Sequence, residues 1–127
     1  MIRTFGLTHI ALPVTDLDRS IRFYQALLGA EIRYRSERGD SADISTPGCH
    51  DVITLQKATD QTVGDLGAAQ HIGFRLQAQE NVDVVAEAVL HAGGTVHEKG
   101  HFTPDEPYAF AKDPDGYVIE LWYEPDL

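Results

Sequence analysis

The sequence predicts an α+β fold made of two βαβββ modules, and two observations lead to this prediction. In each half, a strand pattern precedes a helix pattern, and three further strand patterns follow. Three short segments of the first half also return in the second half, in the same order and at a nearly constant offset. The paired segments are Thr8-His9-Ile10-Ala11-Leu12 with Gln70-His71-Ile72-Gly73-Phe74, Leu28-Gly29-Ala30 with Ala92-Gly93-Gly94, and Leu55-Gln56-Lys57 with Ile119-Glu120-Leu121. Each module is therefore expected to form a curved mixed sheet with its helix on one face.

The first half begins with a strand and a capped helix. Ile10, Leu12 and Val14 alternate with other residues, as is typical of a strand. A helix is expected between Asp16, which is suited to an N-cap, and Gly29, because apolar residues between them recur at helical spacing. Three further strands are expected at residues 31–36, 41–46 and 51–57.

The second half repeats this order after a polar, glycine-containing link at residues 58–68. A helix is expected between an N-cap at Asn81 and Gly93-Gly94. Asp113-Pro114-Asp115-Gly116 is a strong turn signal, because Pro presets one turn torsion and Gly accepts a positive φ. The strands of this half are expected at residues 71–76, 95–101, 108–112 and 117–123.

Length and composition favour one globular domain over residues 1–127, with a first module at about 4–58 and a second at about 69–125. The net charge of −10 argues against nucleic acid or an anionic membrane surface as a partner. No stretch approaches the ~20 apolar residues of a membrane span. The single Cys49 excludes an internal disulfide, and no signal peptide is expected, so the predicted location is the cytoplasm.

Four polar residues stand at matching places of the repeat. His9 and His71 lie on the first strand of each half, and Gln56 and Glu120 are aligned on the last strand. Two histidines and a carboxylate form a common transition-metal site that leaves positions open for substrate. Glu120 alternates with apolar residues, and a carboxylate in such a run is costly unless it is paired or bound to metal. Taken singly, each residue is more simply a core histidine or a solvent-facing polar residue, but the matched set predicts one divalent metal site.

Three stretches carry a resemblance to a known family. They are Leu7-Thr8-His9-Ile10-Ala11-Leu12, the run from Asp16 to Tyr24 followed by Leu28-Gly29, and the run from Asp113 to Leu121. In these the chain resembles the vicinal oxygen chelate superfamily of glyoxalases, bleomycin-resistance proteins and ring-cleaving dioxygenases. The resemblance implies paired modules in an open curved sheet around a central metal, and frequently a homodimer. It places the metal ligands at His9, His71 and Glu120, with Gln56 as a fourth ligand in glyoxalase-like members.

The resemblance also implies a small-molecule substrate with two adjacent oxygens. A divalent ion (Fe, Zn, Ni, Co or Mn) would bind those oxygens and stabilise an enediolate or oxyanion. Lyase or isomerase chemistry, slightly favoured by Gln56, needs a base such as Glu120. An iron-dependent extradiol ring-cleaving dioxygenase is the alternative, in which Tyr108, His97 or His101 would handle protons. A non-catalytic, bleomycin-resistance-like binding protein is the alternative from another class.

Overall fold

Each half of the chain folds as a helix packed on a four-stranded sheet. The computed structural model describes residues 1–125, and the chain divides between Val63 and Gly64 into unit 1 and unit 2. Unit 1 contains β1 (His9–Val14), α1 (Leu17–Leu28), β2 (Glu31–Arg35), β3 (Ser41–Ser45) and β4 (Val52–Lys57). Unit 2 contains β5 (Ile72–Arg75), α2 (Val82–Ala92), β6 (Thr95–His101), β7 (Pro107–Lys112) and β8 (Val118–Trp122). The predicted α+β fold of two βαβββ modules is confirmed.

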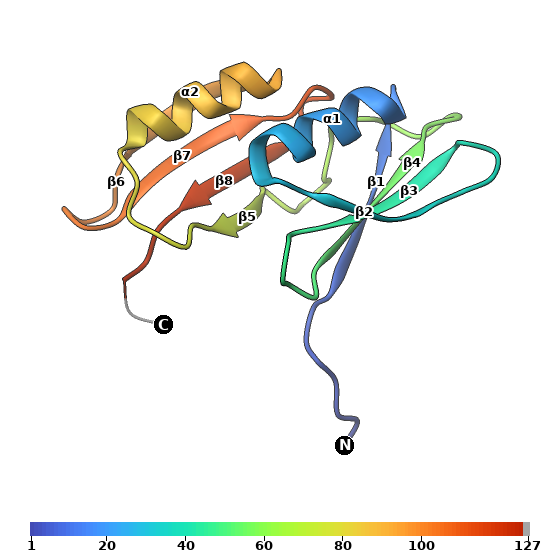
Figure 1. Cartoon of the computed structure of the whole chain (residues 1–127), viewed down its shortest axis with the longest axis horizontal. Coiled ribbons are helices and arrows are strands. Elements are labelled where there is room, and N and C mark those ends of the chain that lie inside the picture. Colours follow the sequence, from blue (N-terminus) through green and yellow to red (C-terminus); the bar gives the residue numbers. More distant parts are fainter. Residues whose placement is uncertain (126–127) are drawn as a thin grey trace. The chain divides into compact units, whose positions relative to one another are not determined.

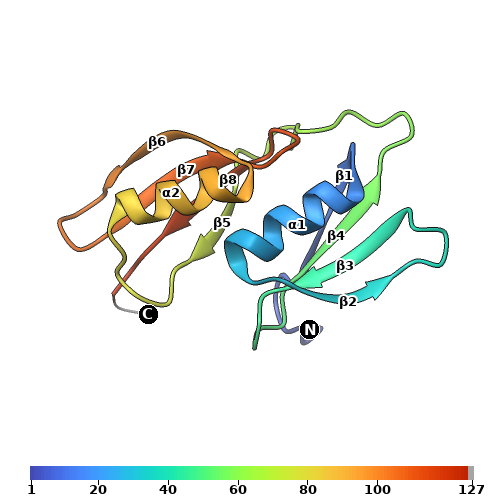
Figure 2. The same ribbon diagram turned by 45° about the horizontal axis from the view of Figure 1, so that its top comes forward.

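The two sheets share one topology. The strand order is β1-β4-β3-β2 in unit 1 and β5-β8-β7-β6 in unit 2. The first and last strands of each unit are parallel neighbours, and the other pairs are antiparallel. Each helix lies along one face of its own sheet (Figure 1, Figure 2). We call the opposite face of each sheet the helix-free face. The predicted site residues are expected on this face.

Helix ends form where the local sequence predicts them. The Asp16 side chain accepts a hydrogen bond from the Arg19 N–H at 3.0 Å, and Asn81 caps α2 in the same way. Gly29 and Gly93 follow the two helices with φ values of 67° and 101°, a backbone region that glycine enters without strain. No helix within residues 1–125 is long and apolar enough to cross a membrane.

Alternation along the strands separates core residues from site residues. In unit 1 the apolar members Leu12, Val14 and Leu55 are buried toward α1. In unit 2 Ile119 and Leu121 are buried in the same way. The intervening residues of β1, β4, β5 and β8 therefore project from the helix-free faces, where alternation places His9, Thr54, Gln56, Gly73, Glu120 and Trp122.

The predicted turn before β8 is confirmed and is held by one carboxylate. Asp113 is 4% exposed, and its side chain accepts hydrogen bonds from the N–H groups of Asp115 at 2.9 Å and Tyr117 at 3.0 Å. The backbone of Asp113 also bonds with Tyr117. Because Tyr117 is committed to this turn, β8 begins at Val118 rather than at the predicted Tyr117.

Asp113→Ala is expected to lower the free energy of unfolding by about 2 kcal/mol, because buried N–H groups lose their acceptor. Urea unfolding followed by circular dichroism measures this change. Asp65→Ala is the control, because Asp65 makes the same kind of bond to the Gly67 N–H at an exposed place. Equal losses in the two variants would contradict the role given to the buried Asp113 carboxylate.

The link between the halves ends on this same turn. Gly64 has φ +79°, and a Cβ built on it would overlap the carbonyl oxygen of Asp115. A hydrogen bond joins the backbone of Gly64 to the side-chain hydroxyl of Tyr117, whose residue surface is 1% exposed. Burial is the main cause that raises the Tyr117 pKa, and the bond to Gly64 opposes it. The start of unit 2 is therefore fixed onto the turn that leads into β8.

Candidate functional site

Unit 2 brings two of the predicted metal ligands together. His71 directly precedes β5, and Gly73 pairs with Glu120 across the parallel β5–β8 ladder. Residues two apart on a strand share a face, so His71 lies on the same face as Glu120. The His71 Nε2 is 3.0 Å from the Glu120 Oε2, and the two side chains are 31% and 12% exposed. A largely buried carboxylate thus has an imidazole as its partner.

This pair fits a metal ion in chemistry and spacing. Imidazole nitrogen and carboxylate oxygen are donors that zinc, iron and manganese accept. Two donors at about 2.0–2.1 Å from one ion, at tetrahedral or octahedral angles, lie about 3 Å apart, which matches the 3.0 Å observed here. A Cβ at Gly73 would lie 3.8 Å from Glu120 Oε2, so β5 presents no side chain beside the carboxylate there. Within residues 1–125, no group of three or more His, Cys, Asp or Glu gathers as a metal cluster, so unit 2 supplies two donors.

In unit 1, His9 is the first residue of β1 and is exposed. It pairs with Val52, and Ala11, two residues further along β1, pairs with Thr54. His9 therefore stands to Thr54 as His71 stands to Glu120. The predicted equivalence of the two histidines agrees with the strand registers.

The predicted equivalence of Gln56 with Glu120 is wrong. Gln56 pairs with Pro13, and its counterpart in unit 2 is Trp122, which pairs with Arg75. The reason is the longer β6, which has 7 residues where β2 has 5, so the repeat offset grows after the helix. Gln56 is exposed on β4, two residues beyond the place that matches Glu120.

Thr54 occupies the place that the repeat analysis gave to Gln56. Its Oγ1 donates a hydrogen bond to the Asp43 Oδ1 on β3 at 2.7 Å. The helix-free face of unit 1 thus holds a half-buried hydroxyl–carboxylate pair next to β1. Sequence reasoning missed Thr54, since its place depends on strand register.

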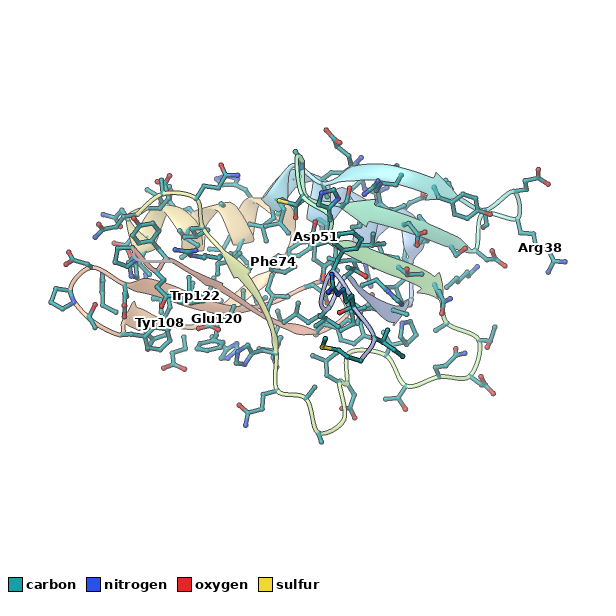
Figure 3. The ribbon with its side chains drawn as sticks, turned by 90° about the horizontal axis from the view of Figure 1, so that it is seen from below. Arg38, Asp51, Phe74, Tyr108, Glu120 and Trp122 are labelled. Carbon is teal, nitrogen blue, oxygen red and sulfur yellow. The ribbon has the colours of Figure 1, made fainter. Side chains whose placement is uncertain are left out.

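Tyr108 lies on the helix-free face of unit 2, where its register partner is Trp122 (Figure 3). Its hydroxyl donates to the Glu98 Oε1 at 3.0 Å. This hydrogen bond is the first cause that raises the Tyr108 pKa, followed by burial and by the negative charges of Glu98 and Glu120. The hydroxyl therefore stays protonated at neutral pH and does not serve there as a general base.

His101 lies on the other face of the same sheet. It pairs with the buried Pro107, and its neighbour Lys99 reaches Asp83 of α2 at 2.7 Å. His101 lines a shallow depression with residues at the start of α2, so the structure does not bring it to Glu120. A register shift between Val96 and Glu98 changes which residues of β6 face the helix.

Aromatic side chains lie near the pair, and the sequence analysis proposed no site role for two of them, Phe110 and Trp122. The Phe110 ring lies 5.1 Å from the His71 ring, centroid to centroid, and 5.6 Å from the Tyr108 ring. The His97 ring lies 6.0 Å from Phe110. Trp122 Nε1 lies 3.6 Å from a Cβ built at Gly73. Phe110 on β7 and Trp122 on β8 alternate with buried residues, and this pattern in the sequence could have identified them.

Comparisons with known proteins agree with this fold. A family model described as Glyoxalase/Bleomycin resistance protein/Dioxygenase superfamily matches residues 6–121. A probable lactoylglutathione lyase of Vibrio parahaemolyticus is 34% identical over 124 residues, which cover 91% of this chain and 88% of that protein. A manganese-dependent 2,3-dihydroxybiphenyl 1,2-dioxygenase of Geobacillus genomosp. 3 is 31% identical over 97% of this chain, which spans 37% of that longer protein.

Solved structures show the same fold. A glyoxalase-related enzyme from Fulvimarina pelagi matches with a TM-score of 0.76 and 20% identity, over 96% of this chain and 90% of that one. The family match covers both modules, and with them His9, His71 and Glu120. The chain therefore belongs to the Glyoxalase/Bleomycin resistance protein/Dioxygenase superfamily.

Proposed function

We propose that this chain is a metal-dependent enzyme that acts on a small molecule with two adjacent oxygen atoms. The observation that carries the proposal is the His71–Glu120 pair, with 3.0 Å between donor atoms and a carboxylate side chain only 12% exposed. A carboxylate this buried is costly to keep unless it is paired or serves as a ligand. The lyase and dioxygenase names of the two relatives support an enzyme over a passive binder.

The proposed ligands are His9, His71 and Glu120. His9 enters because it holds the same place on β1 that His71 holds before β5. Gln56 is not among the proposed ligands, because it was predicted from an equivalence with Glu120 that the strand register contradicts. When bound, the divalent ion would supply Lewis-acid stabilisation of negative charge on the two substrate oxygens.

The chain's own residues limit how protons move. Tyr108 is a hydrogen-bond donor to Glu98, so it orients a neighbour rather than accepting a proton. Glu120 is then the proposed base in unit 2, on condition that its carboxylate leaves the metal, and proton transfer from carbon is what a lyase or isomerase requires. We place this reaction class first, since the lyase relative matches along 88% of its own length.

Ring cleavage is the second candidate, and one observation favours it. Phe110 packs edge-on against the His71 ring, and Tyr108 follows Phe110 along the same face. Flat hydrophobic walls of this kind suit a planar ring next to the ligand pair. Metal identity helps to separate the two candidates, because iron would direct the search to catechols, and zinc, nickel or cobalt to 2-oxoaldehyde adducts. Manganese would fit either candidate, since the dioxygenase relative is named as manganese-dependent.

Elemental analysis of protein purified anaerobically without chelator tests the proposal. Wild-type protein is expected to hold about one equivalent of a divalent metal. His9→Ala and His71→Ala are expected to lose it, because each removes one of three donors. Gln56→Ala is the matched control and is expected to retain the metal, since Gln56 lies two residues beyond the site register. Far-ultraviolet circular dichroism verifies that all three variants fold.

Two results would contradict the proposal. Full metal content in His71→Ala would remove that histidine from the ligand set. A wild-type protein that takes up no metal on reconstitution would instead favour the non-catalytic binder.

A further inference from the structure

A row of aromatic rings extends from the His71–Glu120 pair toward the edge of the sheet in unit 2. Phe110 meets His71 edge-on, and Tyr108 meets Phe110 at 65° between ring planes. Phe102 stacks on Tyr108 with 4.1 Å between centroids and 16° between planes. We call Phe102, Tyr108 and Phe110 the aromatic wall. Phe102 remains 55% exposed, so the outer end of the wall is open to a ligand.

Gly100 fixes the position of Tyr108 in this wall. The two residues are register partners on β6 and β7. A Cβ built on Gly100 would lie 3.1 Å from the Tyr108 hydroxyl oxygen and 3.3 Å from Cζ. The Tyr108 ring therefore lies over the bare backbone of Gly100, and its hydroxyl reaches the Glu98 carboxylate two register pairs away. The carboxylate is tied to the wall through this hydrogen bond.

The charge around the wall is negative. Glu98 accepts the hydrogen bond of the Tyr108 hydroxyl at 3.0 Å, and Glu120 is the register partner of Phe110. The negative charges of both carboxylates raise the Tyr108 pKa. Lys99, next to Glu98, points to the opposite face and bonds with Asp83. Lys112 is at the far end of β7, opposite Val118, and Arg75 on β5 donates to the carbonyl of Glu124. Residues 65–127 carry 3 Lys and Arg against 12 Asp and Glu.

We propose that the aromatic wall and Glu98 form a subsite for a planar ring that bears a positive charge. The ring would lie against the aromatic wall, and the charged group that it carries would lie toward Glu98. Aromatic faces attract cations, and a nearby carboxylate adds to that attraction while it repels an anionic group. The inference rests on the proposed function, since the same molecule would present its adjacent oxygens to the His71–Glu120 pair.

Three catechols that differ in the charge of one substituent test this subsite. They are 2-(3,4-dihydroxyphenyl)ethylamine, 4-methylcatechol and 3,4-dihydroxyphenylacetate, which are cationic, neutral and anionic at pH 7. Their dissociation constants are measured by anaerobic titration calorimetry with metal-loaded protein. The amine is expected to bind about tenfold tighter than the carboxylate, with the methyl compound between them. Equal binding, or a preference for the carboxylate, would overturn the proposal.

Two variants test which residues cause the charge preference and which contribute to the affinity. Glu98→Gln is expected to reduce the tenfold preference to about twofold, whereas Glu87→Gln removes the same charge from exposed α2 and is expected to keep it. Phe102→Ala is expected to weaken all three compounds about fivefold and to keep their order, because it removes stacking but no charge. An unchanged preference in Glu98→Gln, or unchanged affinities in Phe102→Ala, would overturn the subsite.

A second series separates this inference from the proposed function. Phenethylamine, toluene and phenylacetate lack the adjacent oxygens, and they are titrated into metal-free protein. The same charge order there would support the subsite even if elemental analysis found no metal. Normal metal content without any charge order in either series would overturn the subsite and leave the proposed function intact.

Discussion

Glu120→Gln is expected to bind the divalent metal more than about a hundredfold more weakly than the wild-type protein. Mutation of outer partners of metal ligands typically costs ten- to hundredfold, and the loss of a charged ligand costs more. The amide keeps the size of the side chain and its capacity to bond with the His71 Nε2. The metal-free variant is therefore expected to unfold within about 1 kcal/mol of wild type, because one buried charge is removed and its partner is not orphaned.

Metal titration with a competing chelator measures the first effect, and thermal unfolding in chelator measures the second. Chelator is needed in the second experiment because bound metal would itself stabilise the wild-type protein. Glu87→Gln, on exposed α2, controls for the change in net charge. A variant that binds metal normally would remove Glu120 from the ligand set, whereas a variant that fails to fold would give the carboxylate a structural role.

Gly64→Ala is expected to lower the free energy of unfolding by about 3 kcal/mol or more. Two effects add. An alanine at φ +79° is strained, and its Cβ would overlap the backbone carbonyl of Asp115, so the chain must move away. The movement also breaks the hydrogen bond between the Gly64 backbone and the hydroxyl of the buried Tyr117. That hydroxyl then loses one of its native partners. Chemical denaturation followed by Trp122 fluorescence measures the loss.

Gly67→Ala separates backbone strain from contact. Gly67 has a similar φ of +66°, but within the described residues no non-neighbouring atom lies within 4 Å of its built Cβ. This variant is expected to lose about 1–2 kcal/mol from strain alone. The difference between the two variants then reports the contact of Gly64 with the turn. If both variants lose the same free energy, the link is not anchored there.

The parts of the fold that the sequence predicted correctly depend on neighbouring residues. Asp16 and Gly29 bound α1 because a cap is decided within one helical turn. The turn at Asp113 likewise needs only its own four or five residues. The repeat also aligned His9 with His71 correctly, because each lies near the start of its unit, before any change in loop or strand length.

The incorrect parts depend on pairing between distant strands. Gln56 was aligned with Glu120 by a constant offset, but the longer β6 shifts everything after it. His101 was placed beside the site, but a register shift in β6 turns it toward α2. A single-residue change in register moves a side chain to the other face of a sheet, and the sequence of one strand does not encode its partner's length. Glu98 was missed for the same reason.

The parallel pairing of β5 with β8 joins the first and last strands of unit 2. Ile72 pairs with Ile119, so this ladder closes a loop that contains α2, β6 and β7. Long-range pairing of this kind costs loop entropy before it gains contacts, and it slows folding. His71 directly precedes this ladder and Glu120 lies within it, so their donor atoms meet only when the slowest contacts have formed. Metal capture by unit 2 would then report the end of its folding, and a partly folded chain would compete poorly for the ion.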